Sequence, residues 1–228
     1  CASLQAKVKV PFIYTERLSG FVLQKIPKHH YSILPGCFKY ASEITCVSPG
    51  LLDRLQPHTN KHIKVIPNFF DERIFYPDAS VQKNSVFTWV SIGEPANVKG
   101  LDILIHAFAG LKKKLINVSM HLILIDDIPE KEELVKLAVS LGIAADITWT
   151  GLIHQTKIAA ILRESHVLIS ASRVETFGKA IVEAQACGLP VVATKTDGAS
   201  YIITSSKQGE LAAIGSPEDL MRAMGKVY

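Results

Sequence analysis

Short apolar runs rich in β-branched residues alternate with segments of helical periodicity along the whole chain. The pattern predicts strands over residues 10–14, 43–47, 63–66, 86–92, 121–126, 146–150, 166–170 and 190–194. It predicts helices over residues 49–55, 100–115, 130–141, 155–164, 179–187 and 218–226. Several strands are apolar throughout, which is typical of a parallel sheet with both faces buried under helices. The predicted fold class is therefore α/β, with a Rossmann-like, doubly wound parallel sheet.

A polar stretch without periodicity, YPDASVQKNS at residues 76–85, predicts a domain boundary. About three strands are predicted before it, which is too few for a complete doubly wound sheet. After it, strands alternate with helices as in a near-complete domain. Residues 1–75 are interpreted as the remnant of one Rossmann-like domain and residues 76–228 as a second. Because the sequence opens on Cys1 in the middle of this pattern, we expect further sequence upstream.

The composition is that of a globular protein, with 48% hydrophobic and 20% charged residues and a formal net charge of +4. This balance argues against disorder and against a broad nucleic-acid-binding surface. The four cysteines, Cys1, Cys37, Cys46 and Cys187, show no C-x-x-C pair, which argues against a zinc site and against a disulfide framework. No apolar run has the length of a membrane-spanning helix, and no leader pattern opens the chain. A reducing, cytoplasmic location is expected.

Candidate chemistry gathers in residues 170–194, SASRVETFGKAIVEAQACGLPVVAT. A strand is expected to end near Ser170 and a helix to open at Gly178, where the missing side chain lets an anion approach the free N–H groups of the first turn. Glu175 and Glu183 lie eight positions apart, which is about 12 Å along a continuous helix and too far for a shared acid–base step. Together they are interpreted as separate acceptors for sugar hydroxyls beside a phosphate. Taken alone, Glu175 is better explained as a helix-start residue and Glu183 as a solvated face residue.

The block ETFGKAIVEAQACGLPVVAT resembles the donor-site signature of retaining glycosyltransferase family 4, E-x(7)-E followed by an alanine-cysteine-glycine-leucine-proline turn. Three further stretches resemble the family at matching intervals. VIPN at residues 65–68 with Asp71 resembles the interdomain crossover, KGLD at residues 99–102 the phosphate-binding loop, and TGL at residues 150–152 the base-side strand end. The resemblance runs from about Phe12 to Leu220 and implies a GT-B fold of two Rossmann-like domains. The chain would hold the C-terminal donor-binding domain and the end of the N-terminal, acceptor-side domain.

The same resemblance implies a retaining, hexosyltransferase-like enzyme that moves a sugar from a nucleotide-diphosphate sugar to a hydroxyl acceptor in surface polysaccharide or lipopolysaccharide biosynthesis. By position, Glu175 would contact the transferred sugar and Lys99 would neutralise the diphosphate, which makes these two the catalytic residues. Glu183 would hold the ribose. The donor-binding set that the resemblance implies is Gly93, Lys99, Gly100, Thr150, Gly151, Glu175, Thr176, Phe177, Gly178, Lys179 and Glu183.

No metal and no cofactor is expected, since the nucleotide sugar is a substrate. The chain has no D-x-D pattern, and the adjacent Asp126 and Asp127 would diverge on a strand. The histidines form no ligand set. A departing nucleoside diphosphate gathers negative charge, which an ammonium group and helix N-termini would then have to stabilise.

The sequence departs from the family pattern at three places. Glu94 stands where the family usually has an arginine, so Lys179 is interpreted either as the replacement charge or as a solvated helix lysine. DDIP at residues 126–129 replaces a glycine-rich turn, which leaves the identity of the base open. Arg17 follows Glu16 where a histidine is common, and is interpreted as a contact for an anionic acceptor or as a surface arginine.

Because of these departures, two other functions stay open: a nucleotide-sugar-binding module without transferase activity, and an epimerase that acts on the nucleotide sugar. The expected partners of the transferase are the nucleotide-sugar donor and a glycan or lipid-linked acceptor, with no nucleic acid. Peripheral association with the inner face of a membrane would involve sequence outside this chain.

Overall fold

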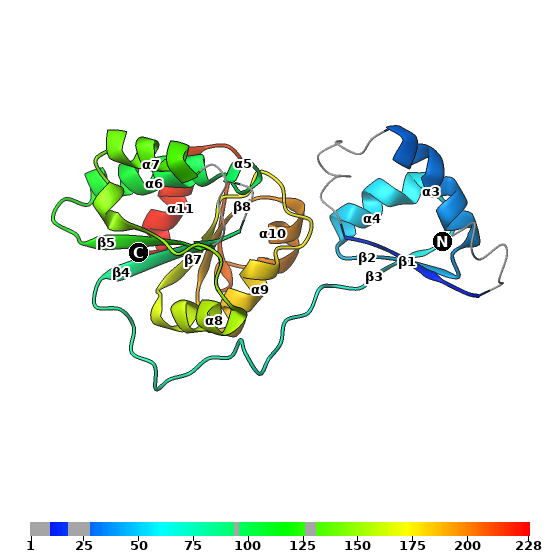
Figure 1. The fold of residues 1–228 in the computed structure, drawn as a ribbon, viewed down its shortest axis with the longest axis horizontal. Helices are drawn as coiled ribbons and strands as arrows, with labels where there is room; N and C mark the ends of the chain where they lie inside the picture. Colours follow the sequence, from blue (N-terminus) through cyan, green and yellow to red (C-terminus); the bar gives the residue numbers. More distant parts are fainter. Residues whose placement is uncertain (1–9, 18–27, 94–95, 126–130) are drawn as a thin grey trace. The chain divides into compact units, whose positions relative to one another are not determined.

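The computed structural model describes residues 10–17, 28–93, 96–125 and 131–228 (Figure 1). The chain divides into two compact units. The first unit contains Cys1–Asn68 and Val174–Phe177, and the second contains Phe69–Arg173 and Gly178–Tyr228. No helix in the described ranges is long and apolar enough to cross a bilayer.

The first unit is built on a three-stranded parallel sheet in the order β1-β2-β3. Its elements are β1 (Ile13–Glu16), α3 (Lys28–Tyr40), β2 (Glu43–Cys46), α4 (Pro49–Leu55), the 3-10 turn η1 (Gln56–His58) and β3 (Ile63–Val65). Helix α4 begins where the sequence predicts, because the Ser48 hydroxyl accepts a hydrogen bond from the N–H of Leu51 and Pro49 fits the first turn.

The second unit is built on a six-stranded, fully parallel sheet in the order β6-β5-β4-β7-β8-β9. The strands are β4 (Phe87–Ile92), β5 (Met120–Ile125), β6 (Ile147–Trp149), β7 (Val167–Ser170), β8 (Val191–Thr194) and β9 (Gly209–Ala212). The helices are α5 (Ala96–Lys99), α6 (Leu101–Lys114), α7 (Lys131–Ser140), the 3-10 turn η2 (Ala144–Asp146), α8 (Gln155–Glu164), α9 (Lys179–Ala186), α10 (Asp197–Ile202) and α11 (Pro217–Val227). This strand order confirms the predicted doubly wound, Rossmann-like arrangement.

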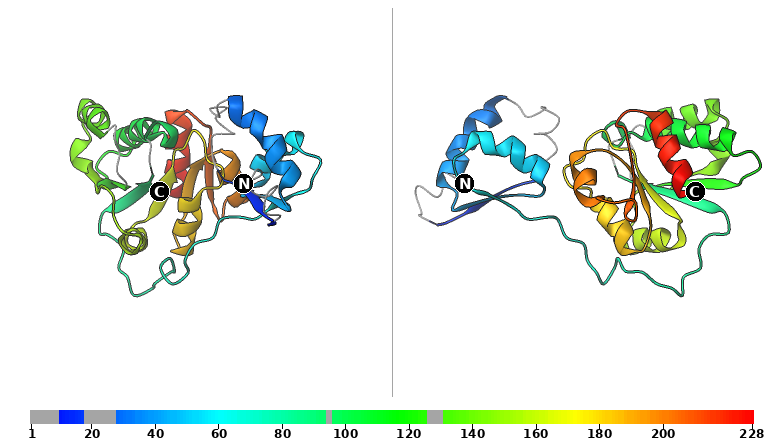
Figure 2. Two further views of the ribbon diagram at one scale, coloured as in Figure 1. Left: turned by 45° about the vertical axis from the view of Figure 1, so that its right-hand side comes forward. Right: turned by 180° about the vertical axis from the view of Figure 1, so that it is seen from behind.

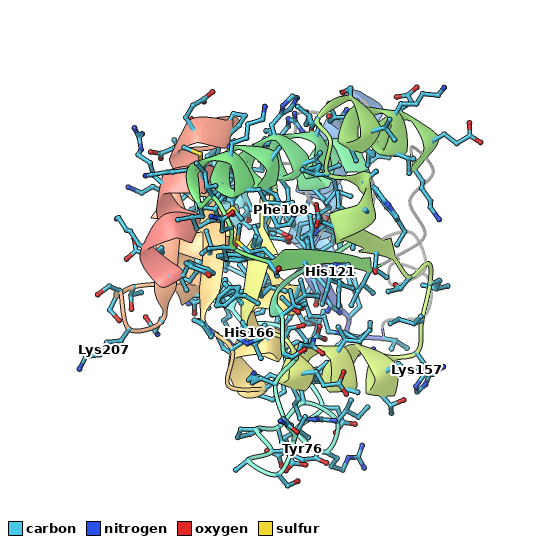
Figure 3. All side chains as sticks on the ribbon, turned by 90° about the vertical axis from the view of Figure 1, so that its left-hand side faces the viewer. Tyr76, Phe108, His121, Lys157, His166 and Lys207 are labelled. Carbon is cyan, nitrogen blue, oxygen red and sulfur yellow. The ribbon has the colours of Figure 1, made fainter. Side chains whose placement is uncertain are left out.

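Helices cover both faces of this sheet (Figures 1 and 2). Helices α6, α7 and α11 pack on one face, where Phe108 of α6 points toward the strands (Figure 3). Helices α8, α9 and α10 pack on the other face. Neighbouring residues of one strand belong to opposite cores: Trp89 and Ile169 to the first, and Val90 and Leu168 to the second. Burial on both faces explains why the strands are apolar throughout.

The sequence predicted most of these elements to within a few residues. Helices α4 and α8 have the predicted bounds, and strands β2 to β8 are each one or two residues shorter than predicted or shifted by one. The prediction for β1 began three residues too early. Helices α3, α5 and α10 and strand β9 were not predicted. Trp89 is fully buried, whereas Trp149 is partly exposed.

The segment between β3 and β4 has no helix or strand, and from Phe69 onward it is grouped with the second unit. Phe75 is 2% exposed and belongs to the core beneath α8 and α9. The N–H of Asn84 donates to the carbonyl of Glu164 at 2.9 Å. The guanidinium of Arg163 lies 4.7 Å from the ring centroid of Tyr76, which is at the end of the molecule beyond α8 in Figure 3. The polar segment at residues 76–85 is therefore held on the second unit; its role as a domain boundary stays a prediction.

Candidate functional site

The candidate site lies at the carboxyl edge of the six-stranded sheet, where β4 neighbours β5 on one side and β7 on the other. The chain leaves β4 toward one face of the sheet and leaves β7 toward the other, so the two following loops separate at this point. Open parallel sheets bind ligands at such a switch point. The loop after β4 holds Gly93 and Lys99, and the loop after β7 leads to Gly178.

Lys99 and Gly93 are in direct contact at the end of β4. A Cβ atom on Gly93 would lie 2.8 Å from Cε and 3.5 Å from Nζ of Lys99, so the lysine side chain crosses the glycine closely. Gly93 also has a φ of +119°. This close approach places the ammonium group at the carboxyl edge of the central strand, and the positive φ favours glycine at position 93.

Gly100 brings the start of α6 against the end of β7. It has a φ of +63°, and a Cβ atom on it would lie 2.2 Å from the main-chain oxygen of Ala171. No side chain caps α6 from the position of Gly100. Asp102 is the acidic residue of its first turn, where a carboxylate interacts favourably with the helix dipole.

Arg173 joins the loop after β7 to the segment that carries Lys99. Its main-chain N–H donates to the carbonyl of Val98 at 2.8 Å. Its guanidinium donates to both carboxylate oxygens of Asp102, at 2.9 and 2.7 Å, and to the carbonyl of Asn97 at 2.7 Å. The hydrogen bond from Arg173 lowers the pKa of Asp102, so the carboxylate is ionised at neutral pH. The two loops of the site thus form one bonded structure.

Helix α9 presents an N-terminus without a side-chain cap. Gly178 occupies the N-cap position with a φ of +93°, and the first carbonyl-paired amides are those of Ile181 and Val182, which bond back to Gly178. Such a start leaves main-chain N–H groups of the first turn directed at the loop, where the helix dipole favours an anion. Gly178 and Lys179 stand at this start, and their contact with a phosphate stays a prediction.

Glu183 points into the molecule rather than onto a solvated face. It is 7% exposed, and one carboxylate oxygen lies 3.3 Å from Nζ of Lys179, one helical turn earlier. Burial raises the pKa of Glu183, and the ammonium of Lys179 opposes that change. The interpretation of Glu183 as a solvated residue is therefore wrong. Lys179 is half exposed and ion-paired, so it is not simply a solvated lysine either.

Thr150 and Gly151 continue the carboxyl edge beyond β6. The N–H of Thr150 donates to the carbonyl of Leu124 at 3.1 Å, which extends the pairing of β5 with β6. The hydroxyl of Thr150 donates to the carbonyl of Gly151 at 2.8 Å. Leu152 follows with 79% of its surface exposed. The role of Thr150 and Gly151 on the base side of the site stays a prediction.

Glu175, Thr176 and Phe177 belong to the segment grouped with the first unit. Thr176 and Phe177 are buried, with 7% and 4% exposed, and Glu175 is partly exposed. Along the chain, Glu175 stands two residues after the bonded Arg173 and three before Gly178. Its predicted contact with a sugar stays a prediction.

Several predicted features lie outside the described residues: Glu94, and the turn at residues 126–129. In the ranges that the structure describes, no three histidine, cysteine or acidic side chains gather into a set that could hold a metal. The residue that the sequence analysis missed is Arg173. The signal in the sequence is a charged residue in the otherwise uncharged stretch ISASRV at residues 169–174.

The family described as glycosyl transferases group 1 matches residues 73–228, which is more than half of the chain. The chain belongs to this family. The match covers both loops of the candidate site and all of β4 to α11.

The curated relatives have low sequence identity to this chain, but the matches cover most of its length. The chain is 28% identical over 181 residues to an N-acetyl-alpha-D-glucosaminyl L-malate synthase of Bacillus anthracis, which covers 75% of this chain and 46% of that protein. It is 28% identical over 194 residues to a lipopolysaccharide core biosynthesis glycosyltransferase of Rhizobium meliloti strain 1021, covering 83% of this chain and 55% of that protein. The chain spans about half the length of these curated relatives.

Solved structures show that the fold is of the GT-B type. A sucrose-phosphate synthase from Thermosynechococcus elongatus superposes with a TM-score of 0.87 at 19% identity, over 99% of this chain and 60% of that chain. The Anabaena protein HepE in complex with UDP and glucose superposes with a TM-score of 0.84 at 22% identity, over 99% of this chain and 64% of that chain. At such identities the likeness concerns the fold alone.

Proposed function

We propose that the second unit binds the diphosphate of a nucleotide sugar and that the complete protein transfers the sugar, with retention and without a metal, to a hydroxyl acceptor. The acceptor is a glycan or a lipid-linked molecule in surface polysaccharide or lipopolysaccharide biosynthesis. The observation that carries the proposal is the ammonium of Lys99 lying across Gly93 at the switch point of the sheet, on the same edge as the uncapped start of α9.

Charge supports this assignment. A nucleoside diphosphate that leaves a sugar gains negative charge, and groups fixed in advance stabilise that charge without reorganising. Lys99 supplies a full positive charge, and the amides at the start of α9 supply partial charges from the helix dipole. Retention by this set requires the acceptor hydroxyl to attack on the face that the leaving group vacates, since the roles assigned to Glu175 and Glu183 are contacts to sugar hydroxyls and not nucleophilic ones.

The two glutamates have different environments, which suits different hydroxyl groups. Glu183 is buried beside Lys179, so a ribose bound there would accept and donate hydrogen bonds in a site largely free of water. Glu175 is partly exposed on the loop before α9, where the transferred sugar would lie. The relatives add support: the Rhizobium protein is named for lipopolysaccharide core biosynthesis, and the Anabaena protein was solved with UDP-glucose.

Binding is tested on this chain by titrating UDP-, GDP- and ADP-sugars in a calorimeter. One of the three nucleotides is expected to bind, and Lys99→Ala is expected to weaken that binding by about 10- to 100-fold, the value of a charge-assisted contact. Lys207→Ala is the matched control. Lys207 is exposed in the loop before β9 (Figure 3), at the amino end of the strand, whereas the candidate site lies at the carboxyl ends of the strands. Failure of all three nucleotides to bind, or equal behaviour of the two lysine variants, would overturn the assignment.

Transfer is tested on the complete protein with the donor that binds. Glu175→Ala is expected to abolish transfer while the nucleotide still binds, and the exposed Glu133→Ala serves as control. Proton NMR of the product reports its anomeric configuration, and an unchanged rate in excess EDTA is expected. Release of nucleoside diphosphate together with a new glycoside distinguishes transfer from epimerisation, which yields an isomerised donor, and from binding alone, which yields neither.

A further inference from the structure

Four hydrogen bonds connect the two loops of the site through a single residue. Arg173 donates its main-chain N–H to Val98, one guanidinium nitrogen to both Asn97 and Asp102, and the other nitrogen to Asp102. Arg173 and Asp102 are 71 residues apart in sequence. The two parallel N–H···O bonds, at 2.9 and 2.7 Å, fix both the distance and the plane of the guanidinium.

We propose that Arg173 and Asp102 are positioning residues that couple diphosphate binding at Lys99 to the placement of the loop that carries Glu175. This inference rests on the proposed function. Lys99 follows Val98 and Asn97 directly, and Glu175 follows Arg173 by two residues. Any shift of the loop after β7 is therefore transmitted through Arg173 to the backbone next to Lys99, and the reverse holds equally because such coupling is reciprocal.

Arg173 has a second, electrostatic effect. Asp102 stands in the first turn of α6, directly after the segment that holds Lys99 and Gly100. An unpaired carboxylate at that point would repel a diphosphate held by Lys99. The guanidinium neutralises it. Arg173 therefore acts by charge on the binding of the nucleotide and by geometry on the position of Glu175, and the two effects can be separated by substitution.

The ion pair is not explained by stability alone. The side chains of Arg173 and Asp102 are 33% and 44% exposed, and solvent screening at such exposure makes an isolated pair a weak contributor to folding. At this exposure, the two parallel hydrogen bonds between Arg173 and Asp102 orient the guanidinium more than they stabilise the folded protein. Lysine in place of arginine would keep the charge and lose the fork.

The test uses the complete protein with the donor identified by calorimetry, and compares Arg173→Ala, Arg173→Lys, Asp102→Asn and the double variant Arg173→Ala/Asp102→Asn. Arg173→Ala is expected to weaken binding of the nucleoside diphosphate about tenfold, within the ~5- to 150-fold range of typical couplings. Adding Asp102→Asn removes the repelling charge, so the double variant is expected to recover most of that binding. All four variants lose the fork, so each is expected to lower kcat by about tenfold.

Arg173→Lys is expected to bind the nucleoside diphosphate as the unsubstituted protein does and still to show the reduced kcat. Arg222→Ala and Asp219→Asn are the matched controls, because these residues form an exposed ion pair on α11. Thermal unfolding of each variant checks that it is folded; if Arg173→Ala is not, Arg173→Lys and Asp102→Asn decide the question through kcat.

The outcomes are distinguishable. If the unsubstituted protein binds no nucleotide, both the proposed function and the coupling are overturned. If it binds and transfers but Arg173→Ala and the double variant bind equally weakly, the electrostatic effect is refuted. If Arg173→Lys transfers at the full rate, the positioning effect is refuted, while the proposed function stands.

Discussion

Replacing Gly100 with alanine tests the close approach on which the site is built. The new Cβ would lie 2.2 Å from the main-chain oxygen of Ala171 and 3.1 Å from its carbonyl carbon. Both are backbone atoms at the end of β7, so neither can rotate out of the way. The start of α6 and the end of β7 would have to move apart, and the contacts of Arg173 would have to move with them.

The magnitude has two parts. An alanine at a φ of +63° has the cost of a left-handed backbone, about 1–2 kcal/mol. Forcing a methyl group into a closely packed site adds about 1–3 kcal/mol. Gly142→Ala provides the control for the first part, because Gly142 has a φ of +72° and nothing within 4 Å of its would-be Cβ.

The assay is thermal or urea unfolding followed by tryptophan fluorescence. The chain has two tryptophans, Trp89 and Trp149, and both lie in the second unit, so the signal reports that unit. Gly100→Ala is expected to be less stable than Gly142→Ala by about 2 kcal/mol, which corresponds to a further loss in Tm of roughly 4–8 °C. Equal destabilisation by the two substitutions would show that the approach of α6 to β7 is not close, and would refute the geometry of the site.

Three further predictions concern stability. Phe75→Ala is expected to destabilise the second unit by about 3–5 kcal/mol because Phe75 is buried in its core, whereas Phe69→Ala, with the side chain 84% exposed, is expected to change it by less than about 0.5 kcal/mol. Similar effects in urea unfolding would mean that the segment before β4 does not pack on this unit. Burial raises the pKa of Glu183, so the folded protein holds a proton more tightly there than the unfolded chain does, and stability falls as pH rises from the unfolded pKa to the folded one. Glu183→Gln is therefore expected to remove this loss, with a Tm that exceeds that of the unsubstituted protein at pH 7.5 and approaches it at pH 4; the opposite order would contradict a raised pKa. Thr194→Val removes a buried hydroxyl that donates to the carbonyl of Ser172 at 2.5 Å, and is expected to cost about 1–3 kcal/mol, measured by the same unfolding assay; a neutral effect would show that this hydrogen bond does not hold the loop after β7.

The sequence by itself determined the elements whose signals are local. The period of apolar residues, the Ser48 cap with Pro49 after it, and Gly188 and Pro190 after α9 each act within a few residues, so they predict where α4, α9 and the neighbouring strands lie. Strand β9 has no such signal. Its sequence GELA mixes apolar and polar residues, and it becomes a strand only because residues 209–212 pair with β8 at the edge of the sheet.

The candidate site divides in the same way. Residues 99–102 and 175–183 each contain their motif within one short segment, so their chemistry could be predicted from the sequence. The burial of Glu183 could not be predicted from the sequence, because it depends on which side of α9 faces the sheet. The pairing of Arg173 with Asp102 depends on the strand order, which sets β7 beside β4 and brings together residues 71 positions apart. Local periodicity carries no information about that order, because every strand of a parallel sheet presents the same apolar pattern; only the packing of the two helix layers onto one sheet decides it.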